Sequence, residues 1–184
     1  MHGYDAKNLG QAFRTVRKNT IQVAEEIPED KYDFRPAEGT RTVAETLKHI
    51  AVSTKWPLRV HGERLTEVKF EMFPEVMAQA ARAEAKLIAK SDILKALHDN
   101  GEVFATFVEG LSDEVLAETV SFPPQANMPP KTRFEMLLSS KEHEMHHRGQ
   151  LMLVERMIGI VPHLTRQMQE RMAAMNQQQA AHTA

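Results

Sequence analysis

Two histidines four residues apart are the most chemically suggestive feature of the sequence. His143 and His147 lie in segment 142–150, which reads EHEMHHRGQ. In an α-helix, residues i and i+4 share a face, so that their imidazoles can approach a single metal ion. The chain holds nine histidines, and the same spacing also fits a pair on a solvated helix surface. The spacing alone therefore leaves two interpretations open, a polar helix face and a metal site.

Two established metal patterns overlap this segment. Residues 143–147 satisfy H-E-x-x-H, the zinc-protease pattern in which the glutamate is the general base. The downstream candidate for a third ligand is Glu170, and no strand-forming sequence is present to hold a peptide substrate. A di-iron bundle needs two Glu-x-x-His pairs on separate helices. Glu144 and His147 supply one pair and the chain supplies no second, so both patterns are disfavoured.

Composition limits the remaining chemistry. The chain has no cysteine, which excludes thiolate ligands, a thiolate nucleophile and a disulfide framework. Any metal must be held by histidines, carboxylates or backbone oxygens. The formal net charge is −2, so no excess of positive charge indicates a nucleic-acid partner.

The sequence also lacks targeting signals. The N-terminal segment MHGYDAKNLGQAF is polar, and no apolar run approaches the roughly 20 residues that a spanning helix needs. We expect a cytoplasmic protein that binds neither nucleic acid nor a membrane and acts on a small molecule.

Helical periodicity predicts the elements that position the histidines. A first helix is expected over 5–27, with Asp5 as its N-cap and Pro28 at its end. A third helix, capped by Ser91, is expected to end near Gly110. The predicted core stripes of these two helices are Leu9, Phe13, Val16, Thr20, Val23 and Ile27, and then Ile93, Leu97, Phe104 and Val108.

Capping boxes mark the second and fourth helices, which carry the candidate ligands. Thr-Val-Ala-Glu at 42–45 and Thr-Arg-Phe-Glu at 132–135 each place a glutamate three residues after a threonine, so that the two side chains can satisfy each other's free backbone N–H groups. The helices are expected over 43–57 and 133–158, with Gly159 as the final C-cap.

The connection over 62–90 is long, and Pro74 is a candidate start for a short helix within it. No alternating strand pattern is evident. The sequence therefore predicts an all-α four-helix bundle with one long crossover connection. We expect this bundle to occupy residues 1–164, followed by a partly helical C-terminal tail over 165–184 with one or two further turns.

The string H-x-x-x-H-R-G-Q-L at 143–151 resembles the signature of the DinB-like (YfiT-type) metal-binding family. The segment TVAETLKHI at 42–50 is similar to that family's pattern S/T-V-A-E-x-L-x-H-I/L. Tyr-Asp-Phe-Arg-Pro at 32–36 and Ile-Gly-Ile-Val-Pro at 158–162 also match. The likeness covers about residues 5–164, and it rests on the order and spacing of all four segments.

The resemblance implies a ligand set. The family's metal-binding histidines correspond to His49, His143 and His147, so that His147 is favoured over His146. A divalent ion is implied, with zinc or nickel as the candidates, because imidazole suits both. Three imidazoles leave coordination positions open, as in catalytic zinc sites. Gln150 is expected to orient His147.

Characterised members use such a site for thiol chemistry, so the resemblance implies a transferase acting with a low-molecular-weight thiol such as bacillithiol or mycothiol. A metal-dependent hydrolase and a non-catalytic metal- or ligand-binding stress-response protein are the alternatives. Among neighbouring residues, Glu144 is expected at the surface, and Gly149 is expected to permit close helix approach. A homodimer is also expected, because an apolar tail stripe must bury either on its own bundle or on that of a partner. This stripe consists of Met168, Met172 and Met175.

Overall fold

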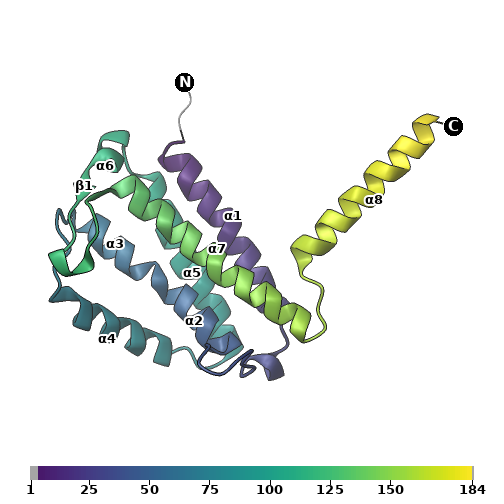
Figure 1. Cartoon of the computed structure of the whole chain (residues 1–184), viewed down its shortest axis with the longest axis horizontal. Coiled ribbons are helices and arrows are strands. Elements are labelled where there is room, and N and C mark those ends of the chain that lie inside the picture. Colours follow the sequence, from purple (N-terminus) through teal and green to yellow (C-terminus); the bar gives the residue numbers. More distant parts are fainter. Residues whose placement is uncertain (1–3, 184) are drawn as a thin grey trace.

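The computed structural model describes residues 4–183, which are predominantly helical (Figure 1). Its α-helices are α1 (Ala6–Glu26), α2 (Val43–Ser53), α3 (Lys55–Gly62), α4 (Met72–Ala85), α5 (Lys90–Glu109), α6 (Asp113–Ala117), α7 (Arg133–Met157) and α8 (His163–Thr183). The short elements are η1 (Glu29–Lys31), β1 (Thr119–Val120), η2 (Pro124–Ala126) and β2 (Lys131–Thr132).

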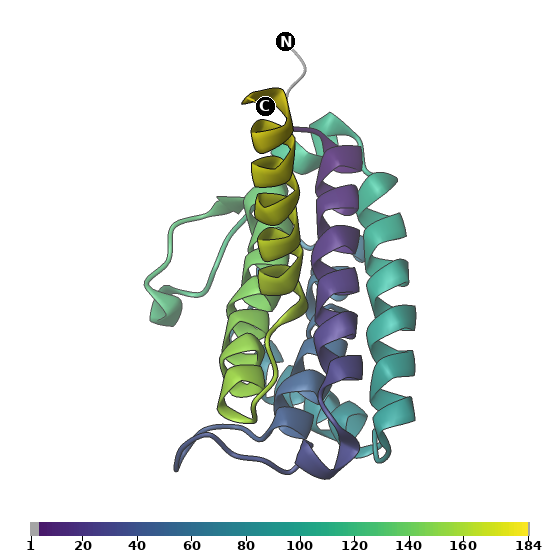
Figure 2. The same cartoon turned by 90° about the vertical axis from the view of Figure 1, so that its right-hand side faces the viewer.

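Four helices form the bundle and confirm the predicted fold class. Helix α1 packs on α5 and α7, and α2 packs on the same two helices (Figures 1 and 2). Every residue of the two predicted core stripes is buried. Asp5 caps α1 as predicted, because its carboxylate accepts the backbone N–H of Asn8 at 2.8 Å. The apolar periodicity of these two helices therefore correctly predicts which of their residues lie in the bundle interior.

The second predicted helix is broken. Helix α2 ends at Ser53, and α3 begins at Lys55 after the buried Thr54. Proline has no N–H, so it would leave a helical carbonyl without its donor in the middle of a helix. The break places Pro57 in the first turn of α3, where no such donor is required.

The connection between α2 and α5 contains α3 and α4, and α4 packs against α2. Pro74 lies in the first turn of α4, as predicted. The prediction that Ser91 caps the next helix is wrong, because α5 already begins at Lys90. The Asp92 carboxylate accepts the free backbone N–H groups of Ile88 and Ala89, at 3.2 and 2.9 Å.

The structure contains a small antiparallel β-ladder that was not predicted from the sequence. Strands β1 and β2 pair Thr119 with Thr132 and Val120 with Lys131, on either side of the proline-rich loop. Each strand has two residues, too few for an alternating pattern to be visible in the sequence. The ladder ends where α7 begins and so fixes the entry to that helix.

The C-terminal tail is one long helix, longer than the one or two turns expected. Its start is anchored: His163 is buried, Arg166 donates to Glu26 at 2.6 Å, and Arg156 donates to Thr165 at 2.8 Å. Beyond this joint, α8 extends away from the bundle (Figure 1). Within residues 4–183, no helix is long and apolar enough to cross a membrane.

Candidate metal centre

Two bundle helices present the three predicted histidines. His49 comes from α2, and His143 and His147 come from α7. Both predicted capping boxes are formed. The Thr42 hydroxyl accepts from the Glu45 backbone while the Glu45 carboxylate accepts from the Thr42 backbone, and Thr132 and Glu135 do the same. These caps set where each helix begins and therefore which of its residues face the partner helix.

The three imidazoles converge. The Nε2 atom of His143 lies 3.0 Å from that of His49 and 3.2 Å from that of His147. One ligand atom from each residue lies within 4.8 Å of the other two. Bonds of about 2.0–2.1 Å to a tetrahedral zinc ion would hold two nitrogens about 3.3 Å apart. The observed separations therefore fit a single ion of this size.

Two side chains lie beside the rings, and one of them is hydrogen-bonded to its histidine. The Nδ1 atom of His147 lies 2.9 Å from the side-chain oxygen of Gln150. Because that oxygen only accepts, Nδ1 carries the hydrogen and the Nε2 lone pair faces the other histidines. His49 Nδ1 lies 3.6 Å from a carboxylate oxygen of Glu84 on α4. An outer hydrogen-bond partner such as Gln150 fixes the tautomer of a metal-binding histidine, whereas the Glu84 contact is too long for a hydrogen bond. Gln150 thus has the position predicted for it.

The site keeps its histidines neutral. Burial lowers the pKa of His49 and of His143 to about 4, and it lowers the pKa of His147 as well. The positive charge of Arg41 acts in the same direction on all three. Neutral imidazole is the form that binds metal, so the three rings are available as ligands at neutral pH.

A buried ion pair lies behind the ligands. Arg17 of α1 donates through Nε and Nη2 to the Glu144 carboxylate, each at 2.9 Å, and both side chains are nearly inaccessible. Arg17 also donates to the carbonyls of Leu97 on α5 and Ile50 on α2. The Arg17 guanidinium therefore connects Ile50, which follows His49, with Glu144, which follows His143.

This arrangement corrects two predictions. Glu144 is 1% exposed rather than at the surface, because it pairs with Arg17. It is therefore held as a carboxylate partner and is not free to act as the general base that the H-E-x-x-H reading requires. Gly149 does not mediate close helix packing, since a Cβ at that position would meet nothing within 4 Å.

Sequence reasoning also missed Arg17 and Glu84. A signal for the buried pair was present: Leu137 and Leu151 lie seven residues on either side of Glu144, which places it on the buried face of α7. Arg17 lies four residues after the buried Phe13. No local pattern indicated Glu84, which reaches His49 from the crossover. His146 lies outside the cluster and is exposed, although it contacts Gln150 at 3.1 Å.

Chemically, three neutral imidazoles from two rigid helices can hold a divalent ion by part of its coordination sphere. Such an ion retains positions for a substrate atom. The described site contributes no carboxylate ligand of its own, so the charge of the ion would remain uncompensated by its ligands. That arrangement would favour an anionic atom in the remaining coordination positions.

Comparison with known proteins agrees with this architecture. The chain is 24% identical over 147 residues to YjoA, an uncharacterised protein of Bacillus subtilis (strain 168), covering 80% of this chain and 86% of that protein. The crystal structure of that DinB-like protein superposes with a TM-score of 0.60, covering 82% of this chain and 91% of the other. The model of the DinB superfamily matches residues 12–151. With that match spanning most of the chain, the protein belongs to the DinB superfamily.

Proposed function

We propose that the protein is a metal-dependent enzyme in which His49, His143 and His147 hold one divalent ion, zinc or nickel. The reaction proposed is the transfer of a low-molecular-weight thiol, such as bacillithiol or mycothiol, to an electrophilic small molecule. The observation that carries the proposal is the convergence of three Nε2 atoms, one of them on the His147 ring whose Nδ1 atom is already hydrogen-bonded to Gln150. A bound ion would supply Lewis acidity and deprotonate a coordinated thiol.

The chain's own residues would provide orientation and charge. Gln150 holds the ring of His147, and Arg17 links α7 to α2 through Glu144 and the Ile50 carbonyl. Arg41 adds positive potential that already acts on all three histidines. An anionic thiol or substrate would be drawn to this side of the bundle by that potential.

Thiol-conjugation assays test this proposal. The metal-loaded protein is incubated with an electrophilic aryl halide and with each of several thiols, before and after chelation. We expect thiol-dependent consumption of the electrophile that chelation abolishes and that added zinc or nickel restores. An equal rate with and without metal would contradict the enzyme proposal.

The second candidate function is a metal- or ligand-binding bundle without catalysis. It is favoured by the placement of Glu144, since its pairing with Arg17 leaves that carboxylate unavailable as a general base. Stoichiometric metal binding without turnover of any thiol–electrophile pair would support this candidate. The same placement of Glu144 argues against a hydrolase of the H-E-x-x-H type.

A further inference from the structure

A pocket lies between α4, α5 and the α2–α3 junction, and none of the three histidines lines it. Its volume is about 570 Å³, within the range usual for small-molecule sites. The pocket is separate from the candidate metal centre, although α4 contributes to both through Glu84 and the adjacent Ala83.

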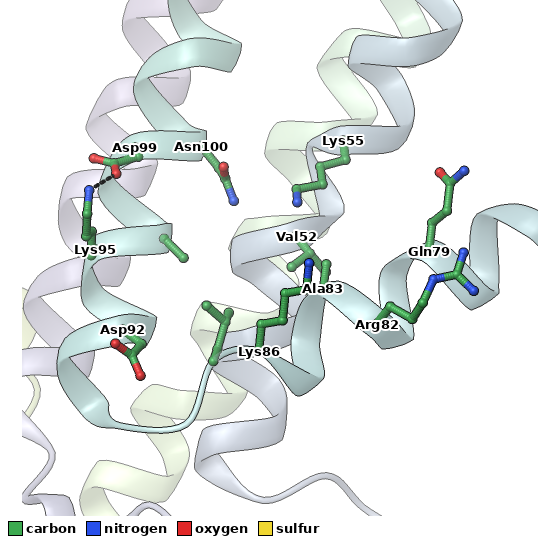
Figure 3. A pocket seen from close by; sticks show the side chains of 12 residues that line it. Val52, Lys55, Gln79, Arg82, Ala83, Lys86, Asp92, Lys95, Asp99 and Asn100 are labelled. Atoms are coloured by element: carbon green, nitrogen blue, oxygen red, sulfur yellow. Dashed lines mark hydrogen bonds and ion pairs between the residues drawn. The ribbon is translucent and has the colours of Figure 1, made fainter.

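The lining carries an excess of positive charge. It includes four cationic side chains, those of Lys55, Arg82, Lys86 and Lys95, and two carboxylates, those of Asp92 and Asp99. Figure 3 shows Lys55 at the start of α3 and Lys86 just after α4 extending into the same space, with Asn100 on α5 across from them.

Both carboxylates already have partners. Asp92 accepts the backbone N–H groups at the start of α5, and Asp99 pairs with Lys95, whose hydrogen bond lowers the Asp99 pKa. Within residues 4–183, no hydrogen bond or ion pair satisfies the side chains of Lys55, Arg82 or Lys86. Three cations therefore line the pocket without compensation from the described residues, and two of them, Lys55 and Lys86, extend into it.

The floor of the pocket is apolar. Val52 is 5% exposed, and Ala83, Leu87 and Ala96 are half-buried beside it. The Asn100 side-chain nitrogen is bound to the Ala51 carbonyl at 2.8 Å, which fixes the amide at the edge of this floor. A ligand that matched the pocket would need both a negative group and an apolar body.

We propose that this pocket binds a small organic anion. Its carboxylate or phosphate lies between Lys55 and Lys86, and its apolar part covers Val52 and Leu87. Lysine ammonium groups bind either headgroup as point charges. A nucleic acid is a poor fit, because the pocket has a volume of only about 570 Å³ and the whole chain has a net charge of −2.

Calorimetric titration of the full-length protein with phenyl phosphate, phenylacetate and inorganic phosphate tests the proposal. We expect saturable one-to-one binding of at least one aryl anion, with inorganic phosphate weaker than phenyl phosphate. The tighter aryl anion identifies the headgroup. Lys55→Gln and Lys86→Gln should each weaken that binding by about tenfold, the effect of one charge-assisted contact. Ala83→Leu should weaken it by filling the floor while leaving every charge in place.

Two control variants make the result specific. Lys7→Gln removes an exposed lysine of α1 that lies outside the pocket, and it should leave the affinity unchanged. His147→Ala alters the candidate metal centre and should also leave it unchanged. The proposal is overturned if neither aryl anion binds saturably, or if Lys7→Gln weakens binding as much as Lys86→Gln does. It is also overturned if His147→Ala abolishes binding, since the anion would then occupy the metal centre.

Discussion

At the scale of single residues, Arg17 links the candidate metal centre to the bundle core. Its guanidinium is bound to the Glu144 carboxylate and to carbonyls of two further helices. Space for it depends on Gly101, where a Cβ would lie 2.8 Å from Arg17 Cγ. Charged groups are rarely buried without such complete pairing. The pair therefore serves to position the two ligand-bearing helices.

Replacing Arg17 with methionine should destabilise the protein strongly. The change leaves the Glu144 carboxylate buried without its partner, which costs about 3–5 kcal/mol in the free energy of unfolding. We also expect weaker metal binding, because Ile50 and Glu144 lose their common partner. Urea unfolding and metal titration measure the two effects.

The matched control is Arg14→Met, one turn earlier on α1. Arg14 is a partly exposed residue that pairs with Glu102 and Glu109. Such pairs contribute at most about 1 kcal/mol. Equal losses of stability in the two variants would show that Arg17 has no special role.

Glu155 offers a test of pH dependence. Its side chain is buried, and neither carboxylate oxygen has a hydrogen-bond partner within the described structure. Burial raises its pKa from 4.5 to about 7. Because the folded state holds the proton more tightly than the unfolded state, this residue lowers the stability of the protein as the pH rises above 4.5, with the full penalty above 7.

Glu155→Gln should therefore stabilise the protein at pH 8 and have little effect on stability near pH 4.5. The denaturant midpoints of the two proteins at these pH values measure the difference. A stabilisation that is the same at both pH values, or a loss of stability at pH 8, would contradict the assignment of a raised pKa.

At the scale of elements, we expect the bundle core to persist without a metal ion. The buried apolar residues of α1, α2, α5 and α7 pack against one another on both sides of the histidine cluster. Chelation should therefore leave the far-ultraviolet circular dichroism strongly helical, in contrast to a zinc finger. Collapse of the helical signal on chelation would indicate a structural metal and would weigh against the enzyme proposal.

Helix starts and apolar faces could be predicted because their signals are local. The two capping boxes lie within four residues each, and the core stripes repeat at helical spacing. The α2–α3 break and the β1–β2 ladder were missed because each depends on very short segments. The length of α8 was missed because its polar, glutamine-rich sequence has little periodicity to mark a helix.

In the candidate site, too, residues with a local sequence signal could be predicted and residues without one could not. His143 and His147 were visible as a local i,i+4 pair. His49 lies 94 residues from His143 in the sequence, and only the family resemblance brought it into the set. Glu84 and Arg17 reach the site from other helices, so their roles depend on tertiary packing. Glu144 was wrongly predicted at the surface because its position around α7 was judged relative to the histidines rather than to the buried leucines of that helix.

At the scale of the whole molecule, α8 carries apolar side chains away from the bundle. Met168, Met172 and Met175 are 61%, 50% and 62% exposed. The outer face of α7 also exposes Leu153 and Met157. Apolar surfaces of this kind are commonly covered by a second copy of the chain in soluble oligomers.

We expect a homodimer in which the α8 methionines are buried against the partner. Light scattering should then give about twice the chain mass of 20.9 kDa. Met172→Glu should shift the protein towards the monomer, since it places a charge in the interface. Met128→Glu, at an exposed loop position, should not. A wild-type mass near 20.9 kDa would contradict the dimer.

Metal content tests the central claim most directly. Purified wild-type protein is loaded with zinc or nickel, desalted and analysed for bound metal, alongside His147→Ala and His146→Ala. We expect up to one equivalent per chain in the wild type and in His146→Ala, whose imidazole lies outside the cluster. His147→Ala should lose most of the metal, because two ligands remain of three. Metal retained in full by His147→Ala, or lost equally in both variants, would show that these three histidines are not the metal site.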